Sequence, residues 1–250
     1  MPPANATYSP LLPGNPVPQT LLLDADDTLW ENNIYFEKAI ASFVEHLNHR
    51  HYTRQQVREF LNQVERESIV EHGYGLHSFR KSLLRCFTLL SERPLSPADE
   101  REILRFTAAI ENHGITLLTG VAETLPALAQ RHRLLLVTKG DVAEQTAKVE
   151  RSGLGKFFSH VEILAEKTAH AYRALVTRHR LDAGRTWMIG NSPRSDINPA
   201  LEAGLHAVFL AHPQTWALEH EELLPAPAGQ QCLRLTSFTD LATVFLPNLE

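Results

Sequence analysis

Two aspartates separated by one residue follow the first apolar run of the sequence. Asp24 and Asp26 stand directly after the leucines at 21–23. If the chain turns at the end of a strand there, both carboxylates can lean into one site. Their negative charge must then be offset by a metal ion, a cation or a proton. The alternative for this segment alone is an acidic turn or a helix cap.

A hydroxyl and two lysines in the second half of the sequence could bind an anion. Thr138 and Lys139 follow the apolar run 134–137 and precede a helix-length segment. The hydroxyl and the free backbone N–H groups there could seat an anion, and a simple helix N-cap is the alternative. Lys167 lies at the head of another helix-length segment, where the helix dipole does not favour a cation. Lys167 therefore either has a role beyond helix stabilisation or is a solvated surface lysine.

A third polar group follows the apolar run at 187–189. In the loop that opens at Gly190, Asn191 offers a carbonyl oxygen and Asp196 a carboxylate, and both suit Mg2+. Alternatively, the loop begins with a glycine for its turn alone and Asp196 caps the next helix. In open parallel sheets, ligands bind beyond the carboxyl ends of the strands. The position of all these residues after apolar runs therefore favours one shared site.

The elements that must position these residues are short strands alternating with helices. The apolar runs lack polar alternation, as expected of parallel strands covered on both faces; they are residues 21–23, 134–137, 161–164, 187–189 and 207–210, with 161–164 the weakest. Helix-length segments lie between the later runs, at 141–152, 167–180 and 197–203. This order predicts an α/β fold with a Rossmann-like parallel sheet flanked by helices.

A long helical segment interrupts this alternation. Apolar residues recur at helical spacing in several stripes between 34 and 113, and no strand-like run separates them. Ser96, Pro97 and Asp99 predict the start of the last of these helices. We divide the chain into a proline-rich tail, an α/β core in two pieces and a helical cap; these are residues 1–19, 20–33 with 114–250, and 34–113.

Composition and charge exclude several classes of protein. The 250 residues are 43% apolar and carry a net charge of -5, without a polybasic block. Such a chain is a poor candidate for binding nucleic acid or anionic membranes. No segment approaches the length of a membrane-spanning helix, no secretory signal is visible, and Cys86 and Cys232 are too few for a disulfide framework. We expect a cytoplasmic protein with no nucleic-acid or membrane partner; the sequence leaves its oligomeric state open.

The first acidic segment resembles the first motif of the haloacid dehalogenase-like (HAD) hydrolase superfamily. That motif is Asp-x-Asp-x-Thr after an apolar strand, and it is matched here by Asp24, Asp26 and Thr28. The helical insert resembles the C1 cap of subfamily I of the same superfamily. The resemblance extends from Leu21 to about Trp216 and implies a HAD-like core with an inserted cap.

The other three motifs of the superfamily are matched in order. Its second-motif hydroxyl corresponds to Thr138 and its third-motif lysine to Lys167. Its acidic loop corresponds to residues 190–196, with one departure. Asn191 stands where the family usually has an aspartate that helps to bind Mg2+. Because an amide brings an oxygen but no charge, we expect weaker Mg2+ affinity with retained activity.

The resemblance implies phosphoryl transfer through an aspartyl-phosphate. Asp24 would attack phosphorus, while Asp26 would protonate the leaving oxygen and then activate water. The cofactor implied is Mg2+, held by Asp24, the Asp26 carbonyl and Asn191.

The remaining motif residues would bind the phosphate. Thr138, the N–H of Lys139 and Lys167 would hold it. Asp196 would orient Lys167 or a metal-bound water.

These implications predict a Mg2+-dependent phosphatase of small phosphorylated metabolites, in the phosphatase branch of the family. In the dehalogenase branch the position of Asp26 is not an acid, because a halide leaves without a proton whereas an alkoxide needs one. A phosphomutase also shuttles a proton and stays open, as does a 2-haloacid dehalogenase. A non-catalytic phosphate-binding or protein-binding module, favoured only by Asn191, is the alternative from another class.

Cap side chains choose the substrate, and the sequence does not reveal which way they face. The loop at 71–75, which carries two glycines, is interpreted as a plain helix connection. A flexible loop facing the substrate is the alternative.

Overall fold

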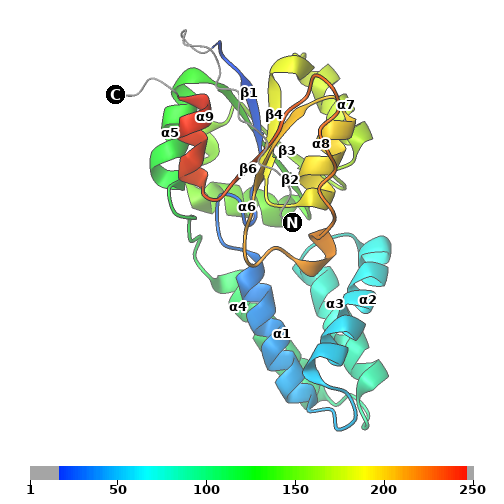
Figure 1. Ribbon diagram of the computed structural model, residues 1–250. Coiled ribbons are helices and arrows are strands. Elements are labelled where there is room, and N and C mark those ends of the chain that lie inside the picture. The colour runs from blue at the N-terminus through cyan, green and yellow to red at the C-terminus, as the bar shows by residue number, and fades with distance from the viewer. Residues whose placement is uncertain (1–16, 247–250) are drawn as a thin grey trace.

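The computed structural model describes residues 17–246 of the chain, which form a parallel sheet with helices on both faces and a separate helical bundle (Figure 1). The strand order is β3-β2-β1-β4-β5-β6, and every neighbouring pair is parallel. The strands are β1 Thr20–Leu23, β2 Arg133–Lys139, β3 His160–Leu164, β4 Thr186–Gly190, β5 His206–Leu210 and β6 Cys232–Leu235. The carboxyl ends of β1, β2 and β4 therefore meet at the middle of one edge of the sheet. Most of the proline-rich tail expected at 1–19 lies outside the described residues.

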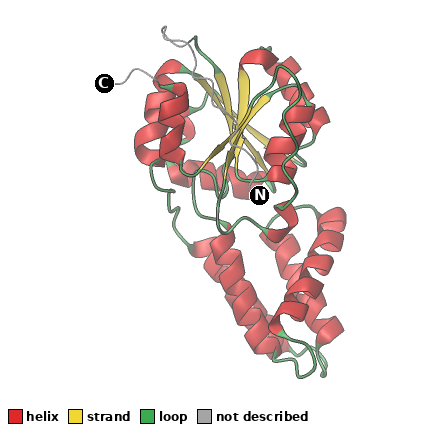
Figure 2. Ribbon diagram, in the orientation of Figure 1, coloured by secondary structure: helices red, strands yellow, loops and turns green. Residues whose placement is uncertain are grey.

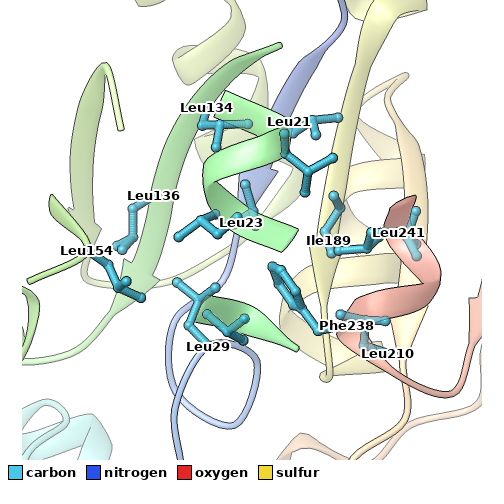
Figure 3. Packing of buried hydrophobic residues seen from close by; sticks show 14 of the residues in the cluster. Leu21, Leu23, Leu29, Leu134, Leu136, Leu154, Ile189, Leu210, Phe238 and Leu241 are labelled. Carbon is cyan, nitrogen blue, oxygen red and sulfur yellow. The ribbon is translucent and has the colours of Figure 1, made fainter. Parts of the chain in front are cut away.

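Successive side chains of each central strand pack on opposite faces of the sheet. Leu21 and Leu23 of β1 belong to one buried cluster, with residues of α5 (Val121–Arg131) and α9 (Leu241–Phe245) (Figure 3). Leu22 belongs to another, with residues of α7 (Ala169–His179) and α8 (Asn198–Glu202). This alternation explains why the strands read as unbroken apolar runs. A further helix, α6 (Val142–Ser152), packs Val149 into the first cluster.

The helices between β1 and α5 form a bundle with its own apolar core (Figure 2). They are α1 Asn33–Leu47, α2 Arg54–His72, α3 Leu76–Leu90 and α4 Pro97–Asn112. As predicted, α4 begins with a capping box in which the Ser96 hydroxyl accepts from the Asp99 N–H and the Asp99 carboxylate from the Ser96 N–H.

The two linkers between sheet and bundle run beside each other. The N–H of Glu31 donates to the carbonyl of Thr116 at 2.9 Å, and the N–H of Leu118 donates to that of Leu29 at 3.0 Å. The bundle is thus joined to the sheet by a short two-stranded neck.

The predicted fold class is confirmed: an α/β core carries an inserted helical cap. All five expected strands are present, and α6 ends at Gly153 in the left-handed conformation, as its glycine suggested. The expected helix at 197–203 is instead a turn of π-helix over Pro193–Ile197 followed by α8. Among the α-helices and strands of residues 17–246, α5, β6 and α9 were not predicted. No helix within residues 17–246 is long and apolar enough to cross a membrane.

Candidate active site

Asp24 lies at the carboxyl end of β1 and is almost completely buried. Its N–H donates to the carbonyl of Ile189 in β4. Its Oδ1 accepts from Lys167 Nζ at 2.5 Å, and its Oδ2 accepts from the Thr28 hydroxyl at 3.0 Å. Burial raises the pKa of Asp24 to about 7, although the Lys167 cation favours the ionised form. The residue can thus serve as a nucleophile only while a nearby positive charge keeps it ionised.

Lys167 is buried between two carboxylates. Its Nζ lies 2.5 Å from Asp24 Oδ1 and 2.7 Å from Asp196 Oδ1. Burial disfavours the cation, but the two carboxylates outweigh this effect and hold the pKa of Lys167 above its usual value. The alternative interpretation of Lys167 as a solvated surface lysine is therefore wrong, because the side chain is buried and paired with two carboxylates.

Asp196 is held in place by the start of its own loop. Its Oδ2 accepts from the Ser192 N–H at 3.0 Å. A Cβ atom at Gly190 would lie only 2.2 Å from the same oxygen, so a side chain there would displace the carboxylate. The glycine at the end of β4 is thus required for the close approach of Asp196 rather than for a turn alone.

Asn191 brings an oxygen beside Asp24. The Thr28 hydroxyl lies 3.4 Å from Asn191 Oδ1 and 3.0 Å from Asp24 Oδ2, so both oxygens gather around it. The amide Nδ2 donates to the Thr215 hydroxyl at 3.0 Å, which fixes its orientation. A carboxylate and an amide oxygen at one strand edge form a donor set that fits Mg2+.

Asp26 lies on the other side of the site, against α6. Its carboxylate accepts from Lys148 Nζ at 2.8 Å, from Gln145 Nε2 at 2.9 Å and from Trp30 Nε1 at 2.7 Å. Burial alone would raise its pKa, but the Lys148 cation and these hydrogen bonds outweigh burial, and the pKa of Asp26 is lowered. The pKa values of Asp24 and Asp26, two aspartates of one motif, are therefore shifted in opposite directions.

Thr138 and Lys139 end β2 beside these residues. The Thr138 hydroxyl donates to Gln145 Oε1 at 3.5 Å. Lys139 Nζ lies 2.6 Å from Glu219 Oε1 and donates to the Ser195 hydroxyl at 2.8 Å. The side chain of Lys139 is thus already paired within the protein.

A single cavity of about 160 Å³ connects all these groups. Its wall includes every candidate residue from the sequence: Asp24, Asp26, Thr138, Lys139, Lys167, Asn191 and Asp196. The opposite wall comes from the cap, with Phe36, Ile40 and Phe79 among its residues. The cavity therefore lies where the sheet edge faces the helical bundle.

The sequence and the fold both have known counterparts. The profile of the family described as haloacid dehalogenase-like hydrolase matches residues 21–210. This chain belongs to that family. No curated protein is similar enough in sequence to count as a match.

Solved structures of HAD-like proteins share the whole architecture. A haloacid dehalogenase-like family hydrolase from Xanthomonas campestris is 24% identical, with a TM-score of 0.75 over 94% of this chain and 98% of its own. The magnesium-bound Bacillus subtilis protein YfnB, described as a HAD-hydrolase, is 19% identical, with a TM-score of 0.64 over 92% and 99%. A 2-haloacid dehalogenase from Pseudomonas syringae is also 19% identical, with a TM-score of 0.57 over 92% and 99%. At these identities the likeness shows the fold alone.

The cap of this HAD-like protein touches the core through the loop between α2 and α3. The Tyr74 hydroxyl donates to a Glu166 carboxylate oxygen, and Lys139 Nζ lies 4.5 Å from the centre of the Tyr74 ring. The N–H of Leu76 donates to Glu144 Oε1 at 2.9 Å. Because Tyr74 and Gly75 also line the cavity, the interpretation of 71–75 as a plain helix connection is wrong.

Several residues of the HAD-like site were missed from the sequence. Gln145 and Lys148, three residues apart on α6, share the helix face that meets Asp26. Their spacing of three residues, in the helix that follows the strand end at Thr138, could have suggested that both side chains face the site. Glu219, by contrast, reaches Lys139 from a C-terminal segment without any periodic pattern, and no sequence signal marks it.

Proposed function

We propose that this HAD-like hydrolase is a Mg2+-dependent phosphatase that acts on small phosphate monoesters through an aspartyl-phosphate. The observation that supports this most is the presence of a second carboxylate, Asp26, in the same cavity as the lysine-bound Asp24. A halide leaves carbon without a proton, whereas the alkoxide released from a phosphate ester needs one. A proton-carrying group beside the nucleophile therefore favours phosphate-ester cleavage over dehalogenation.

Asp24 is the nucleophile of this proposal. Its carboxylate must approach a phosphate dianion, and two unit charges about 4 Å apart repel by roughly 4 kcal/mol at an effective dielectric of about 20. Lys167 reduces this repulsion, since its ammonium group already lies 2.5 Å from Asp24 Oδ1. Thr138 and the Lys139 N–H would hold the other phosphate oxygens at the end of β2.

The residues that would hold Mg2+ are Asp24, Asn191 and the backbone carbonyl of Asp26. When bound, the cation withdraws negative charge from the phosphate and from the attacking carboxylate. Asp196 would act indirectly, because its Oδ1 accepts from Lys167 Nζ at 2.7 Å and so holds the lysine that also contacts Asp24.

Asp26 is the acid and then the base. Lys148 keeps it ionised in the free protein, as its lowered pKa indicates. A bound phosphate dianion acts in the opposite direction, because a neighbouring negative charge favours the protonated carboxyl group. Asp26 would therefore gain a proton as the substrate binds, give it to the leaving oxygen, and be ready to accept one from water.

The test is the release of phosphate from an aryl phosphate with and without Mg2+. We expect turnover that requires Mg2+ and complete loss of it in Asp24→Asn. Asp182→Asn, a change at an exposed helix cap far along the chain, is the control for the loss of one carboxylate.

Three outcomes would contradict the proposal. An active Asp24→Asn variant would refute the nucleophile. Halide release from a 2-haloacid without phosphate release would favour a dehalogenase. Phosphate binding at millimolar Mg2+ without turnover would favour a binding module.

A further inference from the structure

The two walls of the cavity differ in charge. Eight carboxylates and three lysines line it, so its residues carry a net negative charge. The lysines are all on the core, and each is paired with a carboxylate: Lys139 with Glu219, Lys148 with Asp26, Lys167 with Asp24. Among the described residues, the cap places no lysine or arginine on the wall. A phosphate has its partners at the sheet edge, but a second anionic group on the substrate would have none in the cap.

The cap wall carries an apolar surface of two rings and two isoleucines, beside which lie Tyr74, Ser78 and Ser82. Phe36 of α1 and Phe79 of α3 meet edge to face, with ring centres 5.0 Å apart. Ile40 and Ile69 extend the same surface, and Trp216 faces it from the core. The part of the substrate that enters the cap therefore has to present apolar surface to these side chains.

One carboxylate, Glu65 of α2, interrupts this apolar surface. Its side chain is 6% exposed, and its Oε2 accepts from Arg58 Nη1 at 3.1 Å. Arg58 in turn holds Glu37 at 2.6 Å and does not line the cavity. Within residues 17–246, Arg58 is the hydrogen-bond donor of Glu65, and it reaches Oε2. Oε1 is not among the buried oxygens that lack a partner, so this residue of the cavity wall keeps one acceptor open to a donor on the substrate.

We propose that the substrates are phosphate monoesters whose leaving group is apolar next to the phosphate, carries no negative charge, and ends in a hydroxyl or ammonium donor received by Glu65. This inference rests on the proposed phosphatase function, and it deepens that function by naming the substrate class. It also excludes esters whose leaving group bears a carboxylate or a second phosphate, because these would meet Glu65, whose hydrogen-bonded cationic partner, Arg58, is shared with Glu37 and does not line the cavity.

A matched substrate series tests the inference. Alkyl phosphates of increasing chain length are compared with ends of four kinds: methyl, hydroxyl, ammonium and carboxylate. At the chain length that reaches Glu65, we expect kcat/KM to be highest for the donor-bearing ends. The carboxylate end should be at least about a hundredfold poorer than the ammonium end, which corresponds to about 2.7 kcal/mol.

Two variants assign the preference to Glu65. Glu65→Gln keeps the shape but removes the charge, and the ammonium-to-methyl ratio of kcat/KM should fall about tenfold. Glu37→Gln perturbs the same Arg58 from a position off the cavity wall, so it should leave the ratio unchanged. Thermal unfolding of both variants shows whether they are folded, and the series on the unmodified protein tests the inference even if Glu65→Gln is not.

The outcomes distinguish a failure of this inference from a failure of the proposed phosphatase function. Turnover of an aryl phosphate with equal turnover of carboxylate and ammonium ends overturns the inference alone. An unchanged ratio in Glu65→Gln does the same. If neither the aryl phosphate nor any member of the series is hydrolysed, the proposed function fails and the inference falls with it.

Discussion

The sheet edge and the cap wall form the two ends of one cavity, and they differ in their charged side chains: the sheet edge has paired lysines and aspartates, whereas the cap wall, within residues 17–246, has one carboxylate and no lysine or arginine. At the sheet edge, Lys167 and Lys148 are each placed against an aspartate, with Nζ–Oδ distances of 2.5 and 2.8 Å. Of the described residues at the cap wall, Glu65 is the one carboxylate among rings, aliphatic chains and two serines. In our proposal, the first end accommodates a charge that changes during the reaction, and the second selects the substrate by shape and one hydrogen bond.

The same contrast exists within the sheet edge, between the two aspartates of one motif. Burial dominates at Asp24 and raises its pKa to about 7. At Asp26, burial is outweighed by the Lys148 cation and by hydrogen bonds from Lys148, Gln145 and Trp30, and the pKa falls. Two carboxyl groups two residues apart are thus prepared for different tasks by what surrounds them. The lesson is that spacing brings the groups together, whereas partners from other elements decide what each can do.

Replacing Lys167 should have the largest effect on activity and stability at the sheet edge. Lys167→Met leaves Asp24 and Asp196 buried without their shared cation, so one must take up a proton. We expect kcat/KM for an aryl phosphate to fall about a thousandfold and the free energy of unfolding to fall by about 3–5 kcal/mol. Lys156→Met, at an exposed lysine, is the matched control. Activity within tenfold of the parent would show that Lys167 is not needed to keep Asp24 ionised.

Replacing Lys148 tests whether a partner on α6 sets the proton affinity of Asp26. Loss of this cation removes the main effect that lowers the Asp26 pKa, so that pKa should rise in Lys148→Met. We expect kcat/KM to fall about tenfold to a hundredfold, and the limb of its pH profile that reports Asp26 to move to higher pH. A uniform loss of activity with an unshifted profile would mean that Lys148 acts on the structure or on the phosphate instead.

Position 191 allows one negative charge to be added to the sheet edge. Asn191→Asp adds a carboxylate beside Asp24, where the family usually has one. We expect the Mg2+ concentration at half-maximal activity and the calorimetric dissociation constant for Mg2+ both to fall about tenfold. An aspartate cannot donate to the Thr215 hydroxyl, so stability without metal should fall by about 1 kcal/mol. If Mg2+ affinity does not change, Asn191 is not a ligand.

How far the sequence predicts this molecule depends on whether a feature is local. Strands such as β1 and β4 are covered on both faces, so they read as apolar runs, and the residues that follow them fall at one edge by topology alone. The edge strand β6 is only half-buried and includes an exposed Arg234, so it shows no such run. Helix α5 carries Pro126 in its interior, which hides it from a helix prediction.

The site residues that the sequence did not reveal are those whose role depends on contacts between distant parts of the chain. Glu219 meets Lys139 across 80 residues, and Lys148 meets Asp26 across 122. Whether α6 turns Lys148 towards Asp26 depends on how that helix packs on the sheet, which includes the burial of Val149. Position along the chain thus brings the proposed nucleophile and metal ligands to one edge of the sheet, and only packing reveals the charged partners of Asp26 and Lys139.

The smallest expected effect tests how the two ends of the cavity are held together. Tyr74→Phe keeps the ring over Lys139 and its edge contact with Trp216, with centres 6.3 Å apart. It removes the hydroxyl that donates to Glu166 and accepts a long hydrogen bond from Lys139 Nζ at 3.3 Å. A lost hydrogen bond costs about 1 kcal/mol, so we expect KM to rise about two- to fivefold with kcat nearly unchanged. Tyr52→Phe makes the same change at an exposed cap tyrosine and should alter neither constant. A tenfold fall in kcat would instead place the Tyr74 hydroxyl next to the reacting phosphate, because docking of the cap alone would act through KM.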